Sequence, residues 1–284
     1  MVEPSLTGGE PSAEGANHET AAAGPETAAA RMARYYDLDL LDDPGDLDLY
    51  LAMAERTGGP VLELAAGSGR LAVPLARAGY AVTAVDNDAQ MLHRASKACA
   101  GARASGRRRT ALDLELIEAD LTTLSLDARY GLAFIALNSL LLLDGADAQR
   151  RAMQVLADHL RPGGVAIVDV VLPDATELSA YDGRLVLDWM REDPETGDHV
   201  TKLSSARHDA THATVALTTL YDTVSATGAL RRTTRFDLLS LRSVSELVRD
   251  ATDSGLEIES LAGDHQLTPL GPGSERIVLI AVSV

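Results

Sequence analysis

Short apolar runs alternate with segments of helical periodicity through the middle of the sequence. The apolar runs predict strands over Val61–Leu64, Ala81–Asp86, Leu114–Ala119, Leu132–Leu137 and Val165–Val171. Apolar positions at helical spacing lie between these runs, over Arg70–Ala78, Ala89–Ala102 and Ala146–Leu160. The segment LRPGG, Leu160–Gly164, is typical of a helix stop and a turn into the next strand. Apolar strands that alternate with helices indicate a parallel sheet covered on both faces.

The pattern changes after Pro173. Segments rich in Thr and Val follow one another, separated by turn sequences such as DPETGD and SATG. They predict strands over Arg184–Arg191, His199–Arg207, Thr214–Val224 and Ala229–Ser240. Neighbouring strands joined by short turns pair antiparallel, so we expect a small meander inserted after the parallel strands.

Further elements are expected towards both ends of the chain. A helical pattern begins near Ala28 and is broken at Pro44 and Gly45, and Asp46 is the expected cap of the second helix. Ser243 and Glu246 form a capping box at the start of a late helix, and two more strands follow it. Together these patterns predict an α/β fold, with a doubly wound, mostly parallel seven-stranded sheet and a small antiparallel β insert. The two late strands are expected over Leu256–Leu261 and Arg276–Val284.

Composition excludes several classes of function. Of the 284 residues, 46% are hydrophobic and 24% are charged, which is ordinary for a globular protein. No apolar run approaches the roughly 20 residues of a membrane helix, so we expect no membrane partner. The net charge of −17 and an aromatic content of 4% disfavour contacts with a phosphate backbone and stacking on bases. Nucleic acid is therefore not an expected partner.

Cysteine usage and the N-terminal sequence bear on the cellular compartment. Cys99 is the only cysteine, which excludes an internal disulfide and a cysteine-based metal site. The N-terminus lacks a basic segment followed by an apolar one, so we expect no secretory signal peptide. Residues 1–28 are acidic and rich in small residues, which is typical of a disordered tail. We expect a cytoplasmic protein without a metal site.

Glycines and polar residues follow the ends of the predicted parallel strands. In a doubly wound sheet, ligands bind outside the carboxyl ends of the strands, so these residues share one surface. They are the segment Glu63–Gly69, Asp86, Asp120 and Asn138. The glycines of that segment allow a ligand to approach the backbone closely. Asp86 can accept two hydrogen bonds from a ribose diol and Asp120 can accept one from an exocyclic amine, which together indicate an adenosine site.

Two kinds of adenosine ligand fit this surface. The segment Gly67–Ala72 matches the dinucleotide fingerprint, and Asp86 lies about 20 residues further on. A carboxylate at Glu63, however, would repel a pyrophosphate and favour a cationic group. An antiparallel meander also stands where a second mononucleotide-binding half would be expected. An NAD-binding oxidoreductase stays open as the alternative.

The motifs at this surface resemble those of class I S-adenosylmethionine-dependent methyltransferases. LELAAGSGR resembles their first motif, VDND their second, EADL their third and LNSLLLL their fourth, and LRPGG resembles the turn before their fifth strand. The resemblance covers residues 61–172 and resumes at Ser243. Ala65 stands where the first glycine of the first motif is usual. The meander resembles the insert of small-molecule N-methyltransferases.

The resemblance implies a Rossmann-like methyltransferase fold with S-adenosylmethionine as cofactor. It also implies that the N-terminal helix folds over the cofactor. Either Tyr35 or Tyr36 then donates a hydrogen bond to the cofactor, or both tyrosines belong to the core. We assign Tyr36 to the cofactor. The implied cofactor contacts are Tyr36, Glu63, Ala65, Gly67 and Gly69 for the methionine part, Asp86 for the ribose, Asn87, Asp120 and Leu121 for the adenine, and Asn138 near the sulfonium.

Catalysis in this family needs little from the protein beyond alignment. The methyl group arrives activated on a sulfonium, so we expect in-line displacement without a protein nucleophile. A general base is needed only where the acceptor must lose a proton during transfer. His265 and Tyr181 are the candidates, with His208 as a further one. We expect the loop of His265 to face the cavity; a solvated loop is the alternative.

The chain is expected to divide into a tail, a helical lid, a cofactor-binding domain and an insert. The tail is residues 1–28, and the helical lid is residues 29–58. The cofactor-binding domain is residues 59–173 together with 241–284, and the insert, which covers the substrate, is residues 174–240. The expected function is methyl transfer to a small-molecule acceptor, at nitrogen rather than oxygen. A homodimer is left open. The alternatives are an NAD-binding oxidoreductase and a non-catalytic S-adenosylmethionine-binding protein.

Overall fold

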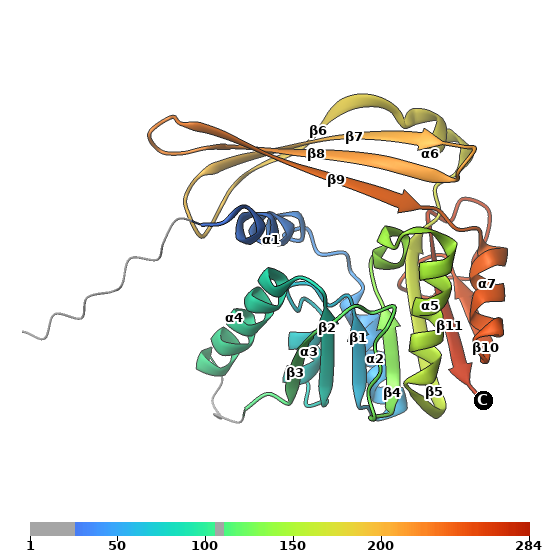
Figure 1. Ribbon diagram of the computed structural model, residues 1–284. Coiled ribbons are helices and arrows are strands. Elements are labelled where there is room, and N and C mark those ends of the chain that lie inside the picture. Colours follow the sequence, from blue (N-terminus) through green and yellow to red (C-terminus); the bar gives the residue numbers. More distant parts are fainter. Residues whose placement is uncertain (1–25, 106–110) are drawn as a thin grey trace, which may run out of the picture.

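The computed structural model describes residues 26–105 and 111–284. The predicted tail, residues 1–28, therefore lies almost entirely outside the described residues. The described part of the chain forms two β-sheets (Figure 1). One is mostly parallel and covered by helices, and the other is an antiparallel sheet beyond the carboxyl ends of the parallel strands.

The first sheet is the predicted doubly wound one. Its strands are β1 (Val61–Leu64), β2 (Val82–Asp86), β3 (Leu114–Glu118), β4 (Tyr130–Ile135), β5 (Leu160–Val171), β10 (Leu256–Ala262) and β11 (Arg276–Ser283). Within the described residues, it has seven strands in the order β10-β11-β5-β4-β1-β2-β3. Strands from β5 to β3 pair parallel, and β11 pairs antiparallel with β5 and β10. The predicted fold class is confirmed.

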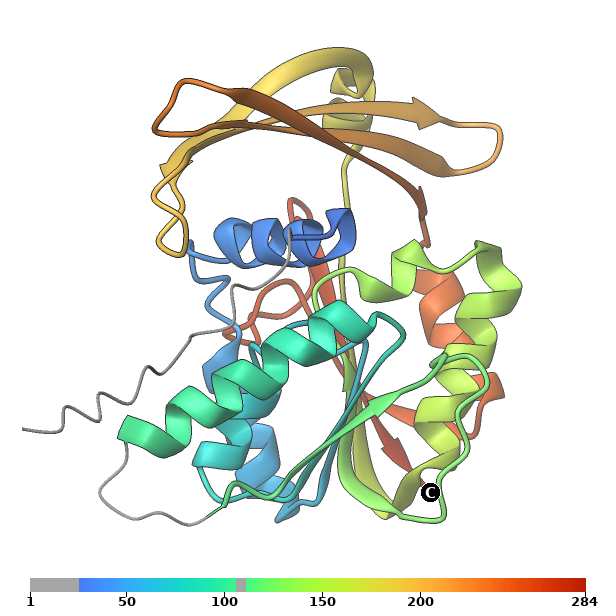
Figure 2. The ribbon, with the colours of Figure 1, turned by 60° about the vertical axis from the view of Figure 1, so that its left-hand side comes forward.

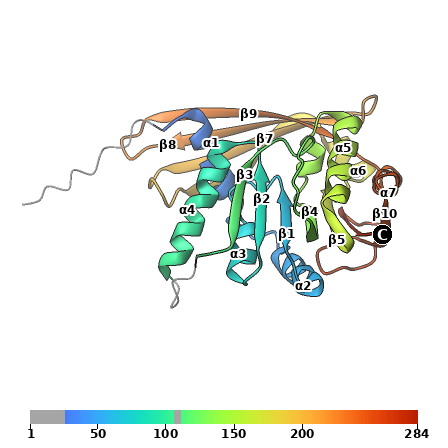
Figure 3. The same cartoon turned by 60° about the horizontal axis from the view of Figure 1, so that its bottom comes forward.

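Helices cover both faces of this sheet because successive strand residues point to opposite sides. On one face lie α2 (Leu47–Thr57) and α3 (Ala72–Arg77), where Tyr50 packs against Phe134 with ring centroids 4.3 Å apart. On the other face lie α5 (Gly145–Asp158) and α7 (Val244–Asp253). The helix α4 (Ala89–Ser105) lies beside β3 at the edge of the sheet (Figure 3).

The second sheet is the predicted antiparallel meander. Its strands are β6 (Asp182–Glu192), β7 (His199–Asp209), β8 (Thr214–Val224) and β9 (Leu230–Ser240), paired in that order. It lies over α1 (Ala28–Asp39), which separates it from the parallel sheet (Figure 2). Tyr35 of α1 is fully buried and stacks on Tyr221 with ring centroids 4.5 Å apart. The apolar side of α1 therefore joins the insert sheet to the domain.

The predicted turn LRPGG is part of a strand. Leu160 already pairs with Tyr130, and Val165 pairs with Leu132. Residues 161–164 consequently bulge out of β5 between two successive pairs with β4. The proline and the glycines predict the turn, but no local pattern indicates that Leu160 already pairs with the neighbouring strand.

The fourth strand ends earlier than predicted, at Ile135. Leu137 and Asn138 have positive φ angles of 45° and 69°, which extended strands do not allow. A short 3-10 helix, η1 (Ser139–Leu142), follows and was not predicted. The chain therefore turns sharply at the carboxyl end of β4, next to the expected ligand surface.

Two capping predictions have different outcomes. Ser243 and Glu246 form the predicted capping box at the start of α7. Asp46 precedes α2, but its side chain makes no capping hydrogen bond and instead pairs with Arg70, with 2.6 Å between Oδ2 and Nη2. The prediction for Asp46 is wrong because a buried carboxylate is better compensated by a guanidinium than by backbone amides. The short helix α6 (Ala175–Ala180) was missed, although Asp174 caps it.

Among residues 26–105 and 111–284, no helix combines the length and the hydropathy that crossing a membrane requires.

Candidate functional site

A cavity of about 420 Å³ lies between the ends of the parallel strands, α1 and β9 of the insert sheet. This volume is within the range of small-molecule sites, about 300–1,000 Å³. Most of its wall belongs to the motifs that follow β1, β2 and β3. The lining from that side comprises Ala65, Gly67, Asp86, Asn87, Asp88, Met91, Ala119, Asp120 and Leu121. The other lining residues are Met32 and Tyr36 of α1, Ser139, Leu142 and Leu143 after β4, and Arg235, Phe236 and Asp237 of β9.

Asp86 ends β2 and is held by two backbone donors. Its Oδ2 accepts from the N–H of Gly67 at 2.7 Å, and its Oδ1 accepts from the N–H of Asp88 at 2.9 Å. Burial raises the pKa of Asp86, and the two donors oppose that effect because they stabilise the carboxylate. Each oxygen retains a further lone pair. The predicted ribose contact of Asp86 stays a prediction, and this geometry permits it.

The glycine loop after β1 contains three left-handed residues. Ala65, Gly67 and Gly69 have φ angles of 58°, 56° and 81°. A Cβ at Gly67 would lie 3.4 Å from the ring of Tyr36, whereas one at Gly69 would lie 3.0 Å from the Cβ of Ala95. Gly67 therefore lies against Tyr36 at the cavity, whereas Gly69, which is not among the cavity-lining residues, allows α4 to pack closely. Ala65 adopts a conformation that costs a residue with a Cβ about 1–2 kcal/mol.

The end of β3 supplies Asp120 to the cavity wall. Asp120 accepts hydrogen bonds from the N–H and the hydroxyl of Thr122, at 2.7 and 2.8 Å. These donors lower the pKa of Asp120, so it is ionised at neutral pH. Leu121 and Asn87 line the cavity beside it. The three predicted adenine contacts therefore lie around one cavity.

The two neighbouring tyrosines of α1 have separate roles. Tyr35 belongs to the core, and its hydroxyl shares a hydrogen bond of 2.5 Å with the hydroxyl of Thr223. Tyr36 lines the cavity against Gly67. Burial, with smaller contributions from the negative charges of Glu63 and Asp86, raises the pKa of Tyr36 to about 12. Its hydroxyl is therefore a neutral donor at physiological pH.

Glu63 lies on β1 behind the loop rather than in the cavity wall. Its side chain is buried, and its Oε2 has no hydrogen-bond partner among the described residues. Burial raises its pKa to about 8, partly opposed by the positive charge of Arg70. The carboxyl group is thus largely protonated at pH 7, so the expectation of a fixed anion at this position needs correction. An approaching cation would favour its ionisation.

Asn138 lies outside the cavity lining and joins two strands. Its Oδ1 accepts from the N–H of Val171 at 2.6 Å, and its own N–H donates to the carbonyl of Asp169 at 3.0 Å. These bonds hold the turn after β4 against β5. A contact of Asn138 with the sulfonium stays a prediction.

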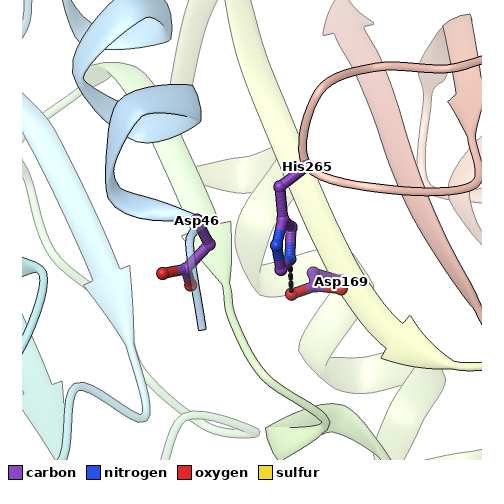
Figure 4. Close-up of side chains that lie close together, drawn as sticks. All are labelled: Asp46, Asp169 and His265. Carbon is purple, nitrogen blue, oxygen red and sulfur yellow. Dashed lines mark hydrogen bonds and ion pairs between the residues drawn. The ribbon is translucent and has the colours of Figure 1, made fainter. Parts of the chain in front are cut away.

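His265 lies in a buried charged cluster at the end of β5 (Figure 4). Its Nε2 is 3.0 Å from Oδ2 of Asp169, and both side chains contact Arg276. Asp46 lies close enough that carboxylate and imidazole ligand atoms of the three residues fall within 4.8 Å of one another. Arg70 and Arg276 pair with the two carboxylates and so supply the positive charge that a cation would bring. We therefore assign no metal to this cluster.

The predicted catalytic residues do not line the cavity. His265 is held in the charged cluster, and Tyr181 follows α6, where its carbonyl accepts from the N–H of His208 at 2.9 Å. Burial and the charge of Glu177 raise the pKa of Tyr181. A general-base role for any of the three stays a prediction without a geometric argument in its favour.

Sequence reasoning missed the insert side of the cavity. Arg235 and Asp237 of β9 both line it and form an ion pair, with 2.9 Å between Nε and Oδ1. Two residues apart on a strand, they point to the same face. The alternation along β9 identifies that face in the sequence, but nothing there places it opposite the glycine loop.

Comparisons with known proteins agree with this geometry. Residues 61–164 match a family described as a methyltransferase domain. The chain carries a class I methyltransferase domain. The cypemycin N-terminal methyltransferase of a Streptomyces species is 22% identical over 223 residues, which is 78% of this chain and 82% of that protein.

Solved structures share the fold of this methyltransferase chain. An S-adenosylmethionine-dependent methyltransferase from Clostridium acetobutylicum superposes with a TM-score of 0.74 at 17% identity, covering 90% of this chain and 99% of the other. The sugar N-methyltransferase KedS8 of a Streptoalloteichus species has a TM-score of 0.66 at 20% identity, covering 99% of each chain. The predicted enzyme class, an S-adenosylmethionine-dependent class I methyltransferase, is confirmed, and with it the cofactor. The alternative of an NAD-binding oxidoreductase finds no support.

Proposed function

We propose that this methyltransferase moves a methyl group from S-adenosylmethionine to the nitrogen of a small amine. The observation that carries the proposal is the cavity that the motif loops and β9 line together. Cofactor-binding residues and an ion pair of the insert face one enclosure, so donor and acceptor would meet there. The N-methyltransferase activity in the names of two similar proteins supports the same choice.

The residues present fit the cofactor. Asp86 keeps lone pairs for the ribose hydroxyls, and Asp120 offers an acceptor to the adenine amine. Oε2 of Glu63, which has no hydrogen-bond partner among the described residues, lies behind the loop that would receive the methionine part. Tyr36 offers a hydroxyl donor against Gly67. A Cβ at Gly67 would be in van der Waals contact with the ring of Tyr36, so the loop and Tyr36 lie against each other at this cavity.

The acceptor side favours a cation. A second cavity of about 310 Å³ shares Leu142, Arg235, Phe236 and Asp237 with the first. Its other lining residues are Asp144, Leu238 and Ser240. Two carboxylates thus face a single guanidinium around this space. Asp237 is well shielded, with 15% of its side chain exposed. A protonated amine would compensate the excess negative charge, which a phenol or a carboxylic acid would not.

The chemistry then needs positioning rather than a reactive side chain. When bound, the cofactor supplies a methyl group already activated on sulfur. The amine would bind as an ammonium ion and lose one proton to water before the cavity closes. Asp237 would then accept a remaining N–H of the amine and so direct the nitrogen lone pair towards the motif loops. Such alignment can contribute about 7–11 kcal/mol. The helix α1 and the insert sheet would exclude water from the cavity.

Several finer assignments belong to this proposal. Residues 29–58 and 174–240 would act as lids over residues 59–173 and 241–284. The single cysteine supports a cytoplasmic location. We also propose that the protein is a homodimer.

The proposal is tested by binding and product analysis. Calorimetric titration with S-adenosylmethionine should give saturable binding, and mass spectrometry should detect methylation within a panel of amines, phenols and carboxylic acids. Products confined to the amines would support the assignment. Methylation of phenols alone would move the activity to oxygen, and binding without any product across the panel would indicate a non-catalytic binding protein.

A further inference from the structure

The helix α1 is bound to the insert sheet by buried contacts. Tyr35 stacks on Tyr221 of β8. Arg34 forms an ion pair with Asp193, in the turn between β6 and β7, and both side chains are buried. Asp39, the last residue of α1, accepts hydrogen bonds at 2.7–2.9 Å from three side chains of the insert, those of Trp189, Lys202 and Tyr221. Because separation would leave buried charges uncompensated, α1 and the insert sheet form one structural unit.

On its other side, α1 meets the parallel domain along two cavities. Met32 and Tyr36 line the cavity of the candidate site. Asp37 and Leu40, at the end of α1, line a pocket of about 270 Å³ whose other walls are the glycine loop, α3 and α4. Protein interiors are close-packed, so two cavities along one contact mark the surface at which the two parts can separate.

Arg94 of α4 bridges this surface. Its guanidinium forms ion pairs with Asp37 of α1 and with Glu195, in the turn between β6 and β7. The side chain of Arg94 is 15% exposed, and its hydrogen bond lowers the pKa of Glu195, so this carboxyl group is ionised at neutral pH. A guanidinium presents its donors in a rigid fork, which suits two carboxylates at once. Arg94 therefore joins α4 to both parts of the unit.

The opposite end of the insert sheet is fixed to the parallel domain. Gln149 of α5 is buried and donates to the carbonyl of Ser240 at 2.9 Å, and the N–H of Gly145 donates to the Ser240 hydroxyl at 3.3 Å. Ser240 ends β9, and the register of the strands places the turn between β6 and β7 at the other end of the sheet. In Figure 1, this end of β9 lies beside α5, and the sheet extends from there across α1. Ser240 thus holds one end of the unit and Arg94 the other.

We propose that Arg94 is a positioning residue, which holds α1 and the insert sheet closed over the cofactor as one unit. The unit opens along the two cavities, about the end of the sheet at Ser240. The inference rests on the lids of the proposed function and adds the contact that closes them, whichever acceptor is methylated. Arg94 is not among the cavity-lining residues, so its ion pairs stabilise the closed form equally with and without cofactor. Their loss should therefore speed cofactor entry and exit alike.

Surface plasmon resonance with the immobilised full chain and S-adenosylmethionine tests the proposal. Arg94→Gln should raise the association and dissociation rate constants together, each by about 10-fold, and leave Kd within about threefold. Loss of a residue that binds the cofactor would instead raise the dissociation rate constant and Kd by the same factor. The matched control is Arg150→Gln, whose ion pair with Asp147 lies within α5, and it should leave both rate constants unchanged.

Further variants test the fork and the joint movement. Arg94→Lys keeps the charge but not the fork, so its rate constants should fall between those of the wild type and Arg94→Gln. Glu195→Gln should raise both rate constants, and its combination with Arg94→Gln should have no additional effect. Trp189 is the only tryptophan and donates to Asp39 of α1, so its quenching by acrylamide should be the same in Arg94→Gln as in the wild type.

The outcomes separate this contact from the fold and from the reaction. Unchanged rate constants in Arg94→Gln, even with a lower melting temperature, would overturn the role of Arg94, and so would a rise in Kd that comes from dissociation alone. Stronger quenching of Trp189 would show that α1 leaves the insert sheet and would overturn the joint movement. None of these measurements needs an acceptor, so a failure of the proposed amine methylation would appear separately, as a missing product.

Discussion

The Oδ2 atom of Asp86 accepts a hydrogen bond from the backbone N–H of Gly67 at 2.7 Å. This bond joins the end of β2 to the loop after β1, so the carboxylate and the glycine that would both contact the cofactor hold each other in place. The same carboxylate therefore serves the loop geometry and the ligand. Its removal should affect binding more than the loss of one contact would.

Asp86→Ala should weaken the affinity for S-adenosylmethionine by about 100-fold or more, because hydrogen bonds to a charged group contribute about 1.5–3 kcal/mol each. Isothermal titration calorimetry measures the dissociation constant. Asp48→Ala on the first turn of α2 is the matched control and should bind normally. Equal affinities for the two variants would remove Asp86 from the cofactor site.

Glu63→Gln should change how stability depends on pH. The pKa of Glu63 is raised from 4.5 to about 8, so its contribution to the free energy of unfolding is fully present below 4.5 and is lost as pH rises through 8. The stability of the wild type relative to the variant should fall by on the order of 2–4 kcal/mol from about pH 5 to about pH 9. Urea unfolding at several pH values measures this difference. Glu257→Gln, at an exposed position of β10, should show a flat difference.

Ala65→Gly should stabilise the protein. Ala65 has a φ of 58°, a region that glycine occupies freely and alanine does not. Relief of this strain, reduced by the larger entropy of glycine in the unfolded chain, should add about 0.5–1 kcal/mol. Thermal and urea unfolding would detect the gain. A lower melting temperature would contradict the assignment of strain to this residue.

Tyr35→Phe and Tyr36→Phe should separate stability from binding. The Tyr35 hydroxyl bonds Thr223 in the core, so its loss should reduce the free energy of unfolding by about 1–2 kcal/mol and leave cofactor affinity unchanged. The Tyr36 hydroxyl lies at the cavity, so its loss should weaken cofactor binding with little effect on stability. The reverse pattern would exchange the two assignments.

Asp237→Asn should impair the amine and not the cofactor. Asparagine keeps the shape but removes the charge that would hold a protonated acceptor, so KM for the amine should rise about 10-fold or more. The dissociation constant for S-adenosylmethionine should stay within about twofold. Initial rates at several amine concentrations measure KM, with Asp253→Asn on the exposed side of α7 as the control. An unchanged KM would place the acceptor elsewhere.

Local signals in the sequence were sufficient for most of the strands and helices. Apolar runs and helical spacing predicted the parallel strands because these patterns depend on residues a few positions apart. These patterns failed where the structure depends on residues distant in the sequence. Leu160, for example, joins β5 only because it pairs with Tyr130 of β4. Asp46 was misassigned for the same reason, since its partner Arg70 lies on a different element.

The sequence by itself determined the doubly wound sheet, the meander and the positions of Gly67, Asp86 and Asp120 at one edge, because parallel strands bring their carboxyl ends together whatever packs around them. Only the tertiary structure decided which of Tyr35 and Tyr36 faces the cavity, how far the pKa of Glu63 rises, and that Arg235 and Asp237 complete the wall. The physical reason is that burial and charge compensation depend on distances between elements, which local periodicity does not contain.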